Sequence, residues 1–128
     1  MTDAELIGIA RAARENAYAP YSDFSVGVAL LATDGRVFTG VNVENASIGL
    51  SVCAERNAIA KAVSEGARSF MKLAVATGSP EPTMPCGVCR QVIWEFGHDV
   101  EILVVGSGDE VVKTTIADLF PQPFTTFE

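Results

Sequence analysis

All three cysteines of this chain fall in two short segments that must meet in the folded protein if they act together. One segment is Cys53-Ala-Glu55, and the other is Pro85-Cys-Gly-Val-Cys89. Cys86 and Cys89 are three residues apart, so on a helix they share a face and can bind one ion. Cys53 has to come from a second part of the chain, so the fold must bring two distant helix starts together.

Three thiolates with an open fourth position are typical of a catalytic zinc site. Zinc in such a site has three protein ligands and binds a water molecule whose pKa falls towards ~7. We therefore expect Cys53, Cys86 and Cys89 to bind one zinc ion. Glu55 stands two residues after Cys53, where its carboxylate can exchange protons with that water, and Arg56 can partly neutralise the thiolates.

Two other interpretations of the cysteines are possible from these residues. A Cys-x-x-Cys pair before a helix is also typical of redox proteins, but this hypothesis leaves Cys53 and Glu55 without a role. A closed structural zinc site needs a fourth ligand, and His98 is the only histidine. Because His98 would lie about 13 Å along a helix from Cys89, we expect it to be a surface residue.

The length and composition predict a single domain, residues 1–128, that folds throughout. Of the 128 residues, 48% are hydrophobic and 20% are charged, which is a globular composition. A net charge of −7 argues against nucleic acid as a partner, because binding to phosphates needs clustered Lys and Arg. The sequence has neither a signal-peptide pattern nor an apolar run of transmembrane length. We expect a cytoplasmic protein with no membrane partner that acts on a small molecule.

Alternating strand and helix patterns predict a mixed α/β sheet. Helices are expected at residues 2–17, 53–66, 85–97 and 116–120. Strands are expected at residues 24–32, 37–42, 70–77, 100–105 and 110–114, the first two joined by a hairpin at Asp34-Gly35. The alternation of strand and helix from residue 37 to 105 implies two crossover connections and a largely buried sheet.

Five sequence blocks occur in an order and spacing typical of one enzyme family. They are Tyr18-Ala-Pro-Tyr-Ser22, Phe24-Ser-Val-Gly27, Gly40-Val-Asn-Val-Glu-Asn-Ala-Ser47, Cys53-Ala-Glu-Arg56 and Pro85-Cys-Gly-Val-Cys-Arg-Gln91. Together they resemble the small, homotetrameric, zinc-dependent cytidine deaminases, from about residue 17 to residue 124. The spacing also fits the general pattern of zinc deaminases, with Cys53 in the first ligand position.

The resemblance implies a fold and a reaction. The implied fold is a three-layer α/β/α sandwich with a mixed five-stranded sheet. The implied reaction is the hydrolytic deamination of cytidine and 2′-deoxycytidine to the corresponding uridines in pyrimidine salvage, with release of ammonia. The family also implies one zinc ion per chain and a homotetramer whose active sites are completed by neighbouring subunits.

The resemblance further implies a role for each site residue. Glu55 would be the catalytic residue, taking a proton from water, protonating N3 of the base and later protonating the leaving amine. The implied substrate-binding residues are Phe24, Asn42, Glu44, Ala54 and Phe124. Among these, Asn42 and Glu44 would bind the ribose 3′-hydroxyl, and Phe124 would reach the site of a neighbouring subunit.

Three further expectations follow from the resemblance. Arg56 and Gln91 are expected to donate hydrogen bonds to the thiolates. Where many family members have a tyrosine after Asn-Ala-Ser, this chain has Ile48, which cannot donate a hydrogen bond and would loosen recognition of the 5′-end of a nucleoside. The alternative within the same chemistry is a deaminase of another cytosine-bearing compound, such as a blasticidin-type antibiotic, although Asn42 and Glu44 favour the ribonucleoside.

Overall fold

The chain forms five strands and four α-helices within residues 1–125, the part that the computed structural model describes. In chain order the elements are α1 (Asp3–Ala13), η1 (Arg14–Asn16), β1 (Val26–Ala32), β2 (Val37–Val41), η2 (Ile48–Leu50), α2 (Ala54–Ser64), β3 (Phe70–Thr77), α3 (Gly87–Glu95), β4 (Glu101–Val105), β5 (Val111–Thr115) and α4 (Ile116–Leu119). Each strand that the sequence predicted is present, which confirms the strand assignment.

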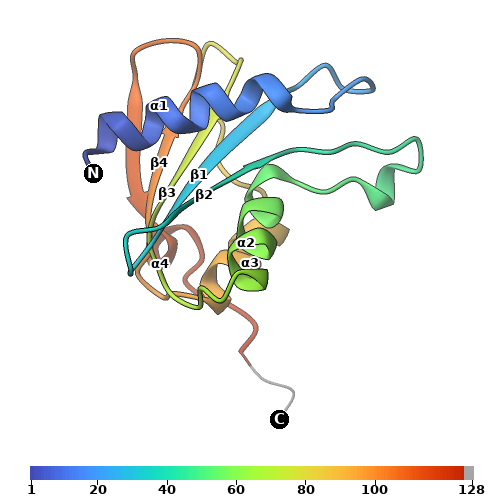
Figure 1. Ribbon diagram of the computed structural model, residues 1–128. Helices are drawn as coiled ribbons and strands as arrows, with labels where there is room; N and C mark the ends of the chain where they lie inside the picture. The colour runs from blue at the N-terminus through green and yellow to red at the C-terminus, as the bar shows by residue number, and fades with distance from the viewer. Residues whose placement is uncertain (126–128) are drawn as a thin grey trace.

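The sheet is mixed, with strand order β2-β1-β3-β4-β5 (Figure 1). β1 is antiparallel to both β2 and β3, β3 is parallel to β4, and β4 is antiparallel to β5. β2, β3 and β4 therefore all run in the same direction. α2 joins β2 to β3, and α3 joins β3 to β4, so the two predicted crossover connections are confirmed.

Helices cover both faces of the sheet, so the fold is the expected three-layer α/β/α sandwich. α1 packs on one face, and α2, α3 and α4 pack on the other, as Figure 1 shows for α1 and the pair α2 and α3. Successive strand residues point to opposite faces, so Ala29 and Leu31 of β1 pack with the α1 layer, whereas Val28 and Leu30 pack with the other layer. This double coverage explains why β1 is almost continuously apolar.

The first helix is shorter than its sequence pattern indicated. Helical spacing predicted a helix to Ala17, but α1 ends at Ala13 and a 3₁₀ turn follows to Asn16. The Arg14 side chain donates a hydrogen bond from Nε to the carbonyl of Ser25 at 2.9 Å, and the Ala17 N–H bonds to the Arg14 carbonyl at 3.1 Å. The prediction was wrong at this end because contacts with the chain ahead of β1 outweigh helical propensity.

Two glycines allow the helices to approach the sheet closely on its opposite faces. A Cβ atom on Gly27 would lie 2.2 Å from the carbonyl oxygen of Ala10 in α1, and one on Gly40 would lie 2.4 Å from the carbonyl oxygen of Ala54 in α2. The Gly40 Cβ would also lie 2.5 Å from the backbone nitrogen of Ala58. Real Cβ atoms do not approach backbone atoms so closely, so Gly40 sets the depth at which the first turn of α2 rests on β2.

We predict that Gly40→Ala lowers the free energy of unfolding by about 1–3 kcal/mol, because α2 must move away from the sheet. Gly8→Ala is the matched control: Gly8 lies in α1 with no atom within 4 Å of an added Cβ, and this change should stabilise the chain by about 0.5–1 kcal/mol. Urea denaturation measures both. An unchanged midpoint for Gly40→Ala would show that α2 does not depend on this contact.

Candidate metal centre and substrate pocket

The common direction of β2 and β3 brings the N-termini of α2 and α3 to the same edge of the sheet. Cys53 is the N-cap residue of α2 and Cys86 is the N-cap residue of α3, with Cys89 in the first turn of α3. The Sγ atoms of Cys53 and Cys86 are 4.0 Å apart, and those of Cys86 and Cys89 are 3.3 Å apart. The three sulfur atoms all lie within 4.8 Å of one another, so the fold brings the predicted ligands together.

The three sulfur atoms fit the geometry of a tetrahedral zinc site. At a Zn–S distance of about 2.3 Å, neighbouring ligands of a tetrahedron lie roughly 3.8 Å apart, close to the spacing of these thiols. Among residues 1–125 no fourth His, Cys, Asp or Glu side chain joins the group, so one coordination position would stay open. His98 lies beyond α3, where its ring stacks on Trp94 with ring centroids 4.1 Å apart.

The thiols differ in their protonation behaviour. Burial raises the pKa of Cys53 and of Cys89 above the ordinary range for a thiol. Burial acts in the same direction on Cys86, but hydrogen bonds from the backbone N–H and thiol of Cys89 and from the thiol of Cys53 outweigh it and lower the pKa of Cys86. Thiolates at buried positions need a nearby positive charge, and a soft divalent cation such as zinc supplies it.

Glu55 is a buried carboxyl group beside the thiols. It lies in the first turn of α2, and only 5% of its surface is exposed. Burial raises the pKa of Glu55, more than the hydrogen bonds from its own backbone and from the Cys89 thiol lower it. A carboxyl group with a raised pKa can both hold and release a proton near neutral pH, which is what a general acid and base requires.

A pocket of about 300 Å³ opens beside the cysteine group. Its lining contains seven of the predicted site residues: Phe24, Asn42, Glu44, Cys53, Ala54, Glu55 and Cys86. It also contains residues to which the sequence analysis gave no role: Ser22, Val26, Val75, Thr77, Thr83 and Met84. Ser22 lies within one of the five recognised blocks, so its place in the sequence held a signal, whereas Val75 and Thr77 looked like ordinary strand residues.

Asn42 and Glu44 line the pocket, and both form hydrogen bonds with residues 21–26. The Asn42 Nδ2 donates to the carbonyl of Phe24 at 2.8 Å, and its Oδ1 accepts from the N–H of Val26 at 2.9 Å. Glu44 Oε1 accepts from the N–H groups of Tyr21 at 3.0 Å and Ser22 at 3.1 Å, and its Oε2 accepts from the Ser22 hydroxyl. Both side chains therefore shape the pocket wall before any ligand arrives.

Gln91 and Phe124 lie away from this pocket and bind each other. The Gln91 Nε2 donates to the Phe124 carbonyl at 2.9 Å, and the Phe124 N–H donates to Gln91 Oε1 at 3.1 Å. The Gln91 amide thus anchors the C-terminal segment instead of donating to a thiol. Arg56 lines a separate hollow with Val92 and Phe96, and within residues 1–125 it forms no hydrogen bond to a thiol.

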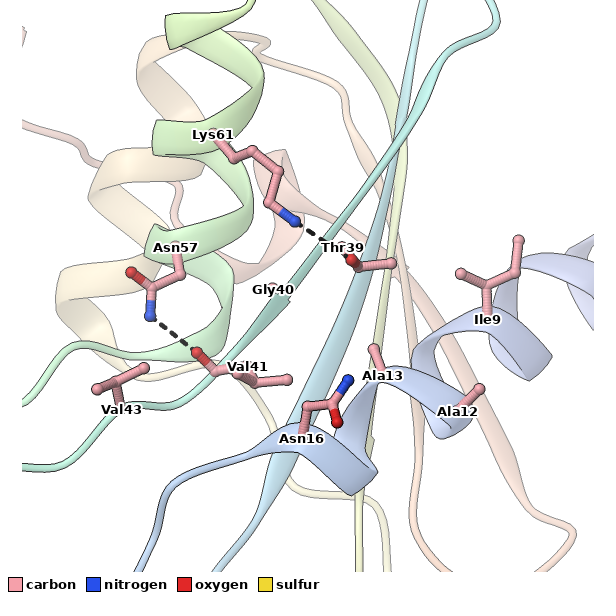
Figure 2. Close-up of a pocket in the computed structure, with 10 residues that line it drawn as sticks. All are labelled: Ile9, Ala12, Ala13, Asn16, Thr39, Gly40, Val41, Val43, Asn57 and Lys61. Carbon is pink, nitrogen blue, oxygen red and sulfur yellow. Dashed lines mark hydrogen bonds between the residues drawn. The ribbon is translucent and has the colours of Figure 1, made fainter.

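A larger hollow of about 630 Å³ lies elsewhere, between α1, the edge strand β2 and α2 (Figure 2). Lys61 donates a hydrogen bond to the Thr39 hydroxyl at 3.3 Å there, and Asn57 donates to the Val41 carbonyl at 2.8 Å. Its described lining has no thiol, imidazole or carboxylate, so it lacks the ligands that zinc prefers despite its size. We also find no helix in residues 1–125 with the length and apolar character needed to cross a membrane.

Comparison with known proteins agrees with this geometry. Residues 1–106 match the family model described as "Cytidine and deoxycytidylate deaminase zinc-binding region", and the chain belongs to this family. It is 46% identical over 122 residues to the cytidine deaminase of Sporosarcina psychrophila, covering 94% of this chain and 90% of that protein. It is 36% identical over 110 residues to the blasticidin-S deaminase of Bacillus cereus, covering 78% and 76%.

Solved structures extend the likeness to the whole fold. The crystal structure of cytidine deaminase from Burkholderia pseudomallei superposes with a TM-score of 0.94 at 48% identity, covering 97% of this chain and all of that one. The crystal structure of cytidine deaminase from Mycobacterium tuberculosis gives a TM-score of 0.86 at 41% identity, with 98% and 100% covered. The zinc cofactor expected from the sequence thus agrees with both the family and the thiol geometry.

We predict that Cys89→Ala lowers bound zinc from about one ion per chain to nearly none, because two thiols hold zinc far less tightly than three. Glu55→Gln is the matched control, since it changes a buried neighbour without removing a sulfur, and it should keep its zinc. Elemental analysis after dialysis measures both variants. Equal zinc content in Cys89→Ala and the unchanged protein would contradict the assignment of Cys89.

Proposed function

We propose that this chain is a zinc-dependent cytidine deaminase that converts cytidine and 2′-deoxycytidine to the corresponding uridines and releases ammonia. The observation that carries the proposal is a buried carboxyl, Glu55, beside three convergent thiols, two of which line the same pocket of about 300 Å³ as Glu55. The relatives and solved structures that carry the name cytidine deaminase support the same reaction. We place the enzyme in the cytoplasm, in pyrimidine salvage.

Cys53, Cys86 and Cys89 are the proposed zinc ligands, and Glu55 is the proposed catalytic residue. Bound zinc would supply the Lewis acidity that activates a water molecule for attack. Glu55 accepts a proton from that water and donates a proton to N3 of the cytosine ring, which makes C4 more electrophilic. A new C4–O bond forms, and Glu55 then takes the proton from the hydroxyl on C4 and passes it to the amino group. The C4–N bond breaks as the C4=O bond of the uridine forms, and ammonia is released.

The remaining proposed substrate contacts divide the pocket between base and sugar. Phe24 and Ala54 line the part that would receive the base, and Asn42 and Glu44 would accept hydrogen bonds from the sugar. The hydrogen bond from the Ser22 hydroxyl, with those from the backbone N–H groups of Ser22 and Tyr21, holds the pKa of Glu44 below its usual range. A carboxylate in that position suits a hydroxyl and repels a phosphate, which favours nucleosides over nucleotides.

We predict that the zinc-loaded protein releases ammonia from cytidine and that Glu55→Gln loses a factor of about 10²–10⁴ in kcat while keeping its zinc. The control is Glu65→Gln, an exposed acid at the other end of α2, which should keep full activity. Coupled ammonia detection measures turnover. Full activity of Glu55→Gln would exclude the proton-transfer role, and turnover of blasticidin S without turnover of cytidine would establish the alternative substrate.

A homotetramer with shared active sites forms part of the same proposal. The apolar side chains that are exposed in the single chain include Ile48 at 81%, Leu50 at 67% and Phe124 at 58%. The edge strand β2 also borders the hollow of Figure 2, which has mostly apolar residues along its walls. These surfaces suit burial against other subunits, with Phe124 completing a neighbour's site and Ile48 replacing the polar contact of the family tyrosine.

For this assembly we predict a solution mass about four times that of one chain, measured by light scattering. Co-expressed Glu55→Gln and Phe124→Ala chains test the shared site. Each variant alone should be impaired, whereas mixed tetramers should recover part of the activity, because a site with intact Glu55 can receive Phe124 from its neighbour. A monomeric mass, or mixtures no more active than the variants alone, would contradict the shared site.

A further inference from the structure

One serine hydroxyl connects the two parts of the pocket that would bind base and sugar. The Ser22 Oγ donates its hydrogen to Glu44 Oε2 and accepts a hydrogen bond from the N–H of Phe24 at 3.0 Å. A hydroxyl has one hydrogen and two lone pairs, so it can serve both partners at once. Ser22, Phe24 and Glu44 all line the same pocket, so this link lies at the site itself.

The turn that carries Phe24 adopts an uncommon backbone conformation. Asp23 has φ of 57°, the only positive value at a non-glycine residue within residues 1–125. This left-handed conformation is unfavourable for most side chains, although aspartate adopts it more readily than most, and the surrounding hydrogen bonds hold it here. The Asp23 N–H donates to the Ala19 carbonyl at 3.0 Å, and Glu44 accepts the N–H groups of Tyr21 and Ser22.

Phe24 is consequently held from both sides of its backbone by residues of the pocket. Its N–H bonds to the Ser22 hydroxyl, and its carbonyl accepts from the Asn42 amide at 2.8 Å. Glu44 is held by the same turn through three hydrogen bonds. Displacing the Ser22 hydroxyl would therefore disturb the aromatic wall and the carboxylate together.

We propose that Ser22 is a positioning residue whose hydroxyl fixes the Glu44 carboxylate relative to the Phe24 backbone, so that the sugar and base of one nucleoside are recognised together. This inference rests on the proposed cytidine deaminase function. Ser22 acts through Glu44 and Phe24 and takes no part in proton transfer, which belongs to Glu55. Its loss should therefore weaken substrate binding and leave the chemical step nearly intact.

The test is a double-mutant cycle on the zinc-loaded protein with Ser22→Ala, Glu44→Gln and the combined variant. Ser22→Ala should raise KM for cytidine about tenfold with little change in kcat, the scale of one lost hydrogen bond to a charged group. If Ser22 acts through Glu44, then Ser22→Ala should add little to the effect of Glu44→Gln. Ser22→Thr keeps a hydroxyl and should restore much of the affinity.

Two comparisons separate positioning from a general loss of structure. The penalty of Ser22→Ala should be smaller for 2′,3′-dideoxycytidine, which lacks the hydroxyls that Glu44 would bind, than for cytidine. Ser25→Ala is the matched control in the same turn, because the Ser25 side chain forms no hydrogen bond within residues 1–125, and its KM should not change. Zinc content and thermal midpoint are measured for every variant.

Additive effects in the cycle, equal penalties for the two nucleosides, or failure of Ser22→Thr to recover affinity would each overturn the role of Ser22. If Ser22→Ala does not fold, Ser22→Thr is compared with Glu44→Gln instead. An equal increase in KM for these two variants would overturn the role of Ser22. Absence of cytidine turnover in the unchanged protein would overturn the proposed function, and this inference with it. If only the inference about Ser22 is wrong, the unchanged protein still deaminates cytidine, and only the KM values of the variants differ from those expected.

Discussion

The shared direction of β2, β3 and β4 determines where a metal ion can be bound in this fold. Helices that follow parallel strands begin at the same edge of a sheet, so α2 and α3 start side by side although β1 lies between β2 and β3. Cys53 and Cys86 are therefore neighbours across a long sequence separation. Gly40 adds the second requirement, because α2 reaches its position only where β2 has no side chain beneath it.

The site brings thiols and a carboxyl group together at buried positions, where their negatively charged forms are unfavourable. Burial raises the pKa of Cys53, Cys89 and Glu55 together, and a bound cation reverses this preference by stabilising thiolates. Metal binding and folding are thereby linked, since the same two helix starts must be in place for either. Arg90, within α3, fixes the start of this helix by donating hydrogen bonds to the carbonyls of Pro85 at 2.8 Å and Leu119 at 2.9 Å.

The sequence was sufficient for much of the fold and for the metal group, because periodicity and cysteine spacing are local signals. The hairpin at Asp34-Gly35, the crossovers and the convergence of the cysteines were all predicted. What it missed depends on contacts between distant segments: Phe24 was expected within a strand but lies ahead of β1, held by Asn42. The pairing of Gln91 with Phe124 has no periodic signal, and Ser22 lacked a role because its partner, Glu44, lies in another block.

The first helix and the segment at Phe124 are attached to different elements of the fold, and this affects how the protein can be handled. Asp3 forms ion pairs with Lys72 at 2.5 Å and with Lys113 at 3.2 Å, at the sheet edge where β3 begins and β5 ends, away from the cysteines. Phe124 is instead bound to α3, the helix that bears two of the three thiols. An affinity tag or a surface linkage at the N-terminus would lie far from the metal-bearing helix, whereas one at the C-terminus would follow a segment that is hydrogen-bonded to that helix.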